Sequence, residues 1–322
     1  MRFFGKTTID FMGRRKMWYT ISAAVILAGI VSVSIKGFHF GIDFKGGTEM
    51  IIQFRQQAEI GKIRTMMDQA GFPRSEIKAY GGPNTILLRT EMQGEGTTVG
   101  DKIRASLQQT FPEDNPKVLQ EQKIGPKVGA ELRRNAFLAV ISSLVAMGLY
   151  VAFRFKFIYG VGAIIALFHD VMVALGAVSI LDGITQYTNF EIDQNMIAAF
   201  LTIIGLSMND TVVIFDRIRE NQKVYRSMGL MELINKSLNE TLSRTIITSG
   251  TVFVITTILF FLGGEVNRGF AFALTIGILT GTYSSIYIAS AIVLDHTNYK
   301  ERKKQKPIVP EKISYEAVNQ GS

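Results

Sequence analysis

The chain has 322 residues, of which 47% are hydrophobic and only 19% are charged. Soluble domains carry about 25% charged residues, so this composition indicates an integral membrane protein. The sequence contains no cysteine, which excludes disulfides, iron–sulfur clusters, thiol catalysis and cysteine zinc sites, and its net charge of +8 requires an explanation.

Six apolar stretches are long enough to cross a bilayer, which takes about 20 mostly apolar residues. They are residues 18–35, 136–153, 157–181, 196–215, 245–262 and 269–294. The first stretch follows a basic run at residues 13–16, as in a cleaved signal peptide, but it is long for one and its best cleavage motif, at 32–34, is weak. We therefore expect it to be a retained membrane anchor.

The basic residues are unevenly distributed among the segments outside these stretches. Four segments are rich in Lys and Arg: residues 1–17, 154–156, 216–244 and 295–322. In contrast, residues 182–195 contain neither Lys nor Arg, and residues 263–268 contain only Arg268. Because basic segments remain in the cytoplasm, both termini are expected there and residues 36–133 outside. This distribution accounts for the positive charge without nucleic acid as a partner.

Residues 36–133 are expected to form a separate domain, and residues 134–294 a transmembrane domain with the remaining five helices. Within the first domain, strands are predicted at 48–54, 76–81, 85–90 and 117–124, and helices at 59–71 and 98–111. The order β-α-β-β-α-β is that of the ferredoxin-like α+β fold. The expected fold class is a polytopic α-helical membrane protein with six transmembrane helices and one extracytoplasmic ferredoxin-like domain, in whose sequence we find no catalytic residue set.

A glycine-rich segment, GIDFKGGT at residues 41–48, precedes the first predicted strand. Gly41, Gly46 and Gly47 permit positive φ angles and close approach of backbones, and Asp43 can accept hydrogen bonds from backbone amides in a turn. Two roles fit this segment: a stiff linker that sets the angle of the domain on the membrane, or a direct contact with substrate. The residues alone favour the linker.

Ionisable side chains inside the spans cost about 2.5–3.5 kcal/mol each on insertion scales, so they are candidates for function. Asp170 follows His169 in the third span, Asp210 lies in the fourth, and Arg244 stands at the start of the fifth. The fourth span and its end contribute three further candidates: Asn209, Asp216 and Arg217.

Two interpretations of the membrane acids remain open. Asp170 and Asp210 can serve as hydrogen-bond acceptors between helices, with His169, Asn209 or Arg244 as partners. Alternatively, one of them gains and loses a proton as access alternates between the two sides of the membrane, and a proton moving through 100 mV releases about 2.3 kcal/mol. A metal site is disfavoured, because neither three ligands at metal spacing nor an H-E-x-x-H motif occurs.

Three repeating patterns predict how the helices pack. Two ladders of small residues predict close helix contacts: Gly162, Ala166, Asp170 and Ala174, and then Ala273, Gly277, Gly281, Ser285 and Ala289. A third pattern predicts an amphipathic helix at residues 229–242, lying along the inner membrane surface with Leu230, Ile234, Leu238 and Leu242 on one face.

Six motifs in this order resemble the SecF branch of the SecD/SecF family, within the resistance–nodulation–division superfamily. They are GIDFKGGT at 41–48, GPKVGAELRRNA at 125–136, LFHD at 167–170, TIIGLSMNDTVVIFDRIREN at 202–221, SLNETLSRTIITSGT at 237–251 and GGEVNRGFAFALTIGILTGTYSS at 263–285. The resemblance covers residues 10–295, and the fourth-span motif is very specific. One departure is Leu206, which stands where such sequences often have Tyr.

The resemblance implies a role in protein export across the bacterial cytoplasmic, or inner, membrane. Such proteins use the proton-motive force to promote translocation of preproteins after their SecA-driven passage through the SecYEG channel, with no enzymatic reaction and no cofactor. Asp210 is then the implied proton-coupling carboxylate and Arg244 its basic partner. His169 and Asp170 are a second candidate pair, while Asp216 and Arg217 mark the cytoplasmic end of the fourth span.

The resemblance also implies partners. Six spans are half of the twelve typical of the superfamily, so a second six-span protein, SecD, is expected to complete the unit by meeting this chain on its small-residue faces. SecYEG, YajC, YidC and the translocating preproteins are further expected contacts. Two alternatives remain: a proton-coupled exporter of lipids or small molecules, and a scaffold that stabilises SecD without coupling.

Overall fold

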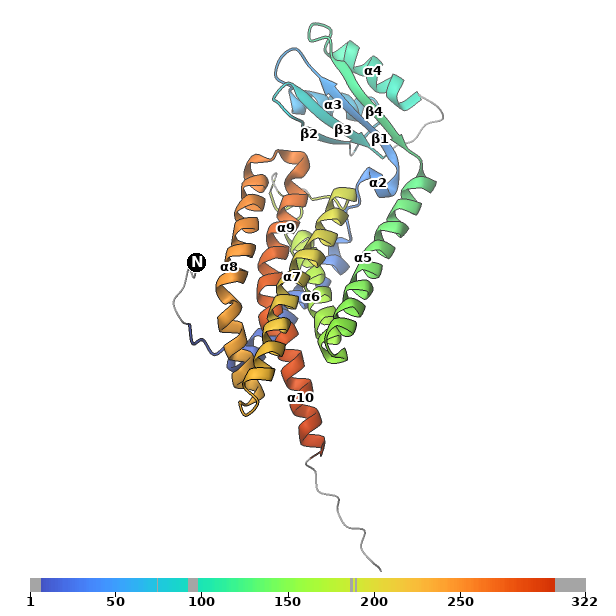
Figure 1. The fold of residues 1–322 in the computed structure, drawn as a ribbon. Coiled ribbons are helices and arrows are strands. Elements are labelled where there is room, and N and C mark those ends of the chain that lie inside the picture. Colours follow the sequence, from blue (N-terminus) through green and yellow to red (C-terminus); the bar gives the residue numbers. More distant parts are fainter. Residues whose placement is uncertain (1–6, 74, 92–97, 186–187, 189, 305–322) are drawn as a thin grey trace, which may run out of the picture.

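The computed structural model describes residues 7–73, 75–91, 98–185, 188 and 190–304. A small sheet domain sits on one end of a bundle of long helices (Figure 1). Within the described residues, six helical segments are long and apolar enough to cross a membrane. This confirms the predicted six transmembrane helices beside a small α+β domain.

The six transmembrane segments are built from eight helical elements. The first is α1 (Arg15–Lys36), which follows a 3-10 turn at Met12–Arg14. The next four are α5 (Pro126–Arg154), α6 (Phe157–Leu181), α7 (Gln194–Val224) and α8 (Leu230–Leu262). The sixth consists of α9 (Glu265–Ser284), a π-helical turn at Ser285–Ala289 and α10 (Ser290–Lys304).

Helix α6 lies at the centre of the bundle, in contact with α1, α5, α7 and α9. Small residues allow these backbones to approach closely. A Cβ atom added at Gly162 would lie 3.0 Å from the carbonyl oxygen of Ala289, and one added at Gly281 would lie 2.9 Å from Cβ of Ser207. Close backbone contact is the usual means of helix association where lipid removes the hydrophobic driving force.

The small-residue ladders therefore pack within this chain. Every member of both predicted ladders, on α6 and on the sixth transmembrane segment, is buried. The expectation that these faces meet a second protein is corrected, because the chain's own helices already cover them.

The segment 216–244, expected to be a loop with a separate surface helix at 229–242, is mostly part of two long helices. Helix α7 continues to Val224 and α8 begins at Leu230, which leaves a short connection. Ile234 and Leu238 of the amphipathic stripe are buried against neighbouring helices, and Asn221 donates a hydrogen bond to Ser237 at 2.9 Å. The stripe thus faces protein, so the helix extends the span.

The sheet domain has four antiparallel strands in the order β2-β3-β1-β4. The strands are β1 (Gly47–Gln53), β2 (Glu76–Ala79), β3 (Thr85–Thr90) and β4 (Lys117–Ile124). Helices α3 (Ile60–Gln69) and α4 (Thr98–Thr110) cover one face around a core that includes Met50, Leu88 and Ile103. The element order and strand order are those of the predicted ferredoxin-like fold.

Alternate residues of these strands point to the other face of the sheet, which is turned toward the bundle. Glu49, Glu76, Lys78 and Arg89 lie on that face, and Arg89 reaches Glu191, in the segment just before α7. The backbone amide of Ala79 donates a hydrogen bond to Glu265 at the start of α9, at 3.0 Å. The domain is therefore held to the bundle by polar contacts.

Candidate functional site

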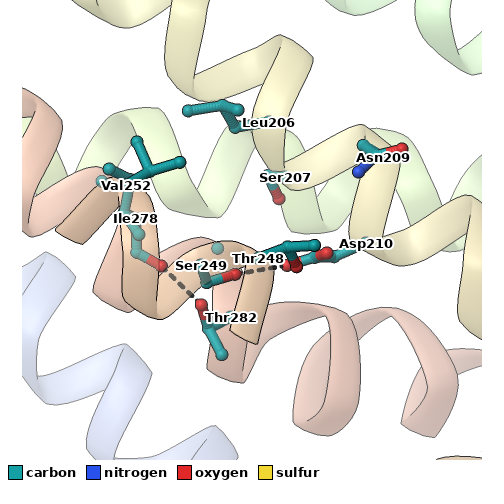
Figure 2. Close-up of a pocket in the computed structure, with 11 residues that line it drawn as sticks. Leu206, Ser207, Asn209, Asp210, Thr248, Ser249, Val252, Ile278 and Thr282 are labelled. Atoms are coloured by element: carbon teal, nitrogen blue, oxygen red, sulfur yellow. Dashed lines mark hydrogen bonds between the residues drawn. The ribbon is translucent and has the colours of Figure 1, made fainter. Parts of the chain in front are cut away.

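Asp210 of α7 faces a small cavity between α7, α8 and α9 (Figure 2). The cavity has a volume of about 60 Å³. The carboxylate is 7% exposed, and its Oδ2 accepts a hydrogen bond from the hydroxyl of Ser249 on α8, at 2.7 Å. The neighbouring hydroxyl of Thr248 is a second donor to this carboxylate. The other residues that line the cavity are Leu206, Ser207, Asn209, Thr248, Val252, Gly277, Ile278, Gly281 and Thr282.

Arg244, expected as the basic partner of Asp210, does not form an ion pair with it. Within the described residues no ion pair of 4.0 Å or less joins the two side chains, and Arg244 is exposed one turn before Thr248 on α8. Asn209 is also exposed, as are Thr202 and Asp216 on the same stripe of α7. Asn209 nevertheless lines the cavity beside Asp210, Asp216 lies 3.8 Å from Arg154 of α5, and Arg244 is close enough for its charge to act on Asp210.

Asp170 lies in a different environment, in the centre of the bundle and with no exposed surface. Its Oδ2 accepts hydrogen bonds from Ser207 of α7 at 2.5 Å and from Ser284 of α9 at 2.8 Å. Its Oδ1 lies 3.0 Å from Nδ1 of His169, whose Nε2 lies 3.0 Å from the hydroxyl of Tyr283. Three helices thus contribute partners to one carboxyl group.

Ser207 lies between the surroundings of the two acids. It binds Asp170 and also lines the cavity that Asp210 faces. Next to it, Ser285, the first residue of the π-helical turn, bonds to Thr211 at 2.8 Å. Sequence analysis singled out Ser285 only as a packing residue and missed Ser207, although Ser207 stands three residues before Asp210 and so shares its helix face.

The described residues contain no group of three or more His, Asp or Glu side chains placed to hold a metal ion. The polar groups around Asp170 and Asp210 are mostly hydroxyls. This donor set suits hydrogen bonding and proton movement.

The glycine-rich segment joins the sheet domain to the bundle. Residues Ile42–Lys45 form a single helical turn, α2, and Gly46 after it has a φ of 84°. A Cβ atom added at Gly47 would collide with the carbonyl oxygen of Thr90 on β3. A Cβ atom added at Gly129 of α5 would lie 2.9 Å from the amide nitrogen of Gly46.

The same segment is bonded to the residues that lead into α7. The amide of Gly41 donates to the carbonyl of Ile192 at 3.0 Å, and the amide of Gln194 donates to Asp43 at 3.2 Å. His39 and Asp182 make a further contact at 2.5 Å. The glycine-rich segment therefore contacts β3, α5 and the residues before α7, which favours the linker interpretation over direct substrate contact.

A buried charge cluster reinforces this junction. Arg89 lies 2.7 Å from Glu49, 3.4 Å from Glu191 and 3.5 Å from Glu76, which also pairs with Lys78. Burial raises the pKa of Glu191 to about 8, and the nearby Glu76 carboxylate contributes in the same direction. One of these two carboxyls therefore carries a proton near neutral pH.

The chain is similar to membrane proteins of protein export along most of its length. A family model described as "Protein export membrane protein SecD/SecF, C-terminal" matches residues 102–299, and one described as "SecD/SecF GG Motif" matches residues 31–58. The protein translocase subunit SecF of Rhodothermus marinus is 43% identical over 295 residues, covering 92% of this chain and 95% of that protein. The protein translocase subunit SecDF of Thermus thermophilus is 40% identical, covering 92% of this chain and 39% of that protein.

Solved structures give the same result. The crystal structure of SecDF from Thermus thermophilus matches with a TM-score of 0.76 at 38% identity, covering 91% of this chain and 39% of that one. A second SecDF structure, in a super-membrane-facing form, matches with a TM-score of 0.68 at 37% identity, covering 94% of this chain and 40% of that one.

The junction should respond to pH through Glu191. Its folded-state pKa is raised from 4.5 to about 8, so its stabilising contribution is complete below the lower value and is lost as pH rises through the upper one. We expect Glu191→Gln, which cannot ionise, to reduce the loss of thermal stability between about pH 5 and about pH 9. Exposed Glu113→Gln in the sheet domain is the control. Equal dependence of thermal stability on pH in the wild type and both variants would contradict the role of Glu191.

The two membrane acids should differ in their structural importance. Asp170→Ala leaves the hydroxyls of Ser207 and Ser284 and the ring of His169 without their acceptor, which should cost about 2–5 kcal/mol. Asp210→Ala removes an acceptor from Ser249 and Thr248 beside an existing cavity, and Thr248 keeps its bonds to the backbone of α8, so the cost should be smaller. Thermal unfolding of the purified variants in one detergent checks the order, and a larger loss for Asp210→Ala would refute it.

Proposed function

The chain belongs to the SecD/SecF family of protein-export membrane proteins, and we propose that it couples proton movement to protein export through Asp210. It is a SecF-type subunit of the bacterial protein-export machinery, and its relatives are named protein translocase subunits. Those names favour protein export over the export of lipids or small molecules. We propose no chemical reaction and no cofactor for the chain itself.

The geometry of Asp210 is the observation that carries the proton-coupling proposal. One water needs roughly 10–15 Å³ of such space, so the cavity of about 60 Å³ beside this carboxyl has room for a short chain of waters. Ser249 and Thr248 of α8 act as hydrogen-bond donors to Asp210, and a carboxylate has about four acceptor sites, so sites remain free for a proton. Asp170 is the weaker candidate, since three side chains already contact its two oxygens.

SecD is the partner that the relatives indicate, because the Thermus SecDF protein carries both names and this chain covers 39% of it. We propose that SecD packs on the α7–α8 face. Thr202, Asn209, Arg244 and Thr251 are all exposed there, in helices that otherwise suit a membrane. Polar groups turned toward lipid are costly, so a second protein is the natural cover for them. Arg244 then lies at the contact with SecD.

We propose that both termini are cytoplasmic and that the sheet domain is outside. The end of α5, the start of α6 and the end of α7 lie opposite the sheet domain (Figure 1). Basic residues stand at or near these helix ends, as the positive-inside rule requires of a cytoplasmic end: Arg154, Lys156, Arg219 and Arg226. In this orientation the sheet domain is placed to meet preproteins that leave SecYEG. Contacts with SecYEG, YajC and YidC belong to the same proposal.

The coupling role is tested by Asp210→Asn, which keeps the shape of the side chain but cannot ionise. In cells depleted of the native protein, we expect this variant to support no faster export of a secreted precursor than the empty vector does, in a pulse-chase measurement. Glu220→Gln removes one exposed carboxylate from the same helix and should restore export like wild type. Membrane abundance and SecD co-purification should be equal for both variants.

Full rescue by Asp210→Asn would remove the proton role from this residue. Failure of both variants at normal abundance would instead favour the scaffold alternative, in which helix α7 supports SecD without titration.

The partner face is tested by cross-linking, which the absence of native cysteine in this chain makes clean. Thr202→Cys, on the exposed stripe of α7, should cross-link to cysteines placed in SecD. In the native chain Leu149 is 51% exposed and belongs to α5, which lies on another side of the bundle from α8 (Figure 1). Leu149→Cys should therefore not cross-link to SecD. Cross-links from Leu149→Cys alone would move the proposed face from α7–α8 to α5.

A further inference from the structure

A second cavity lies at the end of the bundle opposite the sheet domain, where α5 turns into α6 beside α7. Its volume is about 230 Å³. The lining residues are Arg154, Phe155, Lys156, Tyr159, Arg219 and Gln222, three of which are cations and none of which is acidic. We propose that this cavity binds the phosphate head group of an anionic phospholipid.

The charges of this cavity are poorly compensated by the protein. Nη1 of Arg219 donates to the backbone carbonyl of Arg154 at 3.4 Å, and the guanidinium of Arg154 lies over the ring of Phe155, 5.3 Å from its centroid. Among the described residues, the acid paired with one of these cations is Asp216, 3.8 Å from Arg154, and its side chain is 61% exposed. An exposed pair at this distance contributes little. A bound anion would neutralise the mutual repulsion of the three cations.

The cavity also offers hydrogen-bond donors suited to a phosphate group. The hydroxyl of Tyr159 and the side-chain amide of Gln222 lie 3.5 Å apart at its wall. Guanidinium groups bind phosphate through paired hydrogen bonds, and Lys156 adds a point charge directly before the first turn of α6. The positive end of the helix dipole acts in the same direction as these side chains.

Exposed apolar side chains beside the cavity point to a lipid rather than to a free anion. Phe153 is 88% exposed and Phe157 is 78% exposed, on either side of the turn that carries Arg154 and Lys156. In a membrane these rings contact acyl chains, as aromatic residues at the bilayer boundary do. A basic pocket between transmembrane helices with an apolar border fits a charged head group and its attached chains.

The test measures lipid retention by the full-length chain in neutral detergent, using native mass spectrometry with phosphatidylglycerol or phosphatidylcholine. Lys156→Gln combined with Arg219→Gln should weaken phosphatidylglycerol binding about tenfold or more. Lys16→Gln combined with Arg226→Gln removes the same charges from exposed positions at the same end and should leave binding unchanged. Phosphatidylcholine should bind weakly to all three proteins.

Equal loss of phosphatidylglycerol from both double variants would overturn the proposal, because it would indicate diffuse attraction to a basic surface. If millimolar inorganic phosphate displaced the lipid, the cavity would be a site for a free anion, and the proposal of a lipid ligand would be wrong. Unchanged melting temperatures show that the variants are folded. The measurement involves neither SecD nor a proton gradient, so its failure and a failure of the Asp210 proposal are separate results.

Discussion

The burial of Asp170 is the constraint on which the arrangement of the helices depends. A carboxyl group with no exposed surface in an apolar bundle is tolerated only when protein groups satisfy its oxygens. Ser207 and Ser284 provide those bonds from α7 and α9, so both helices must lie close to α6. The glycines at 162, 277 and 281 make such proximity sterically possible. The hydrogen bonds to Asp170 can therefore form only because small residues let the backbones of α6, α7 and α9 approach closely.

Helix α7 joins the membrane interior to the sheet domain without interruption. Gln194 at its start is bonded to Asp43 of the glycine-rich segment, and Asp210 lies sixteen residues further on, about 24 Å away along a helix. Glu265 at the start of α9 contacts β2 in the same way. Under the proposed coupling, a shift of α7 or α9 caused by protonation reaches the domain through these hydrogen bonds between backbone amides and carboxylates. Gly47 packs against the Thr90 carbonyl and Gly129 packs against the backbone of Gly46, so the junction has little freedom to absorb that shift.

The sequence predicts the transmembrane spans and the order of strands well, but it predicts the length of α8 and the hydrogen-bond partners of the acids poorly. Hydropathy identifies the six spans, and strand patterning identifies the ferredoxin-like order, because both depend on local periodicity. The stripe at Leu230, Ile234 and Leu238 is equally consistent with a membrane surface and with a protein neighbour, so it could not show that α8 continues. The donors to the acids were missed for a related reason. Hydroxyl side chains in helices commonly bond to their own backbone, as Thr248 and Thr275 do here, so a serine in a span gives no signal of its own.

The contrast between the two acids follows from how completely each is bonded. Asp170 is held on three sides by groups from packed helices, so any change in its bonding would disturb α6, α7 and α9 together. Asp210 faces α8, which has few buried residues, across a cavity with room for water. Gly205 and Gly250, on the two helices that flank this cavity, have open space around them. A second protein can therefore approach α7 and α8 closely and change the surroundings of Asp210 while Asp170 keeps the core intact.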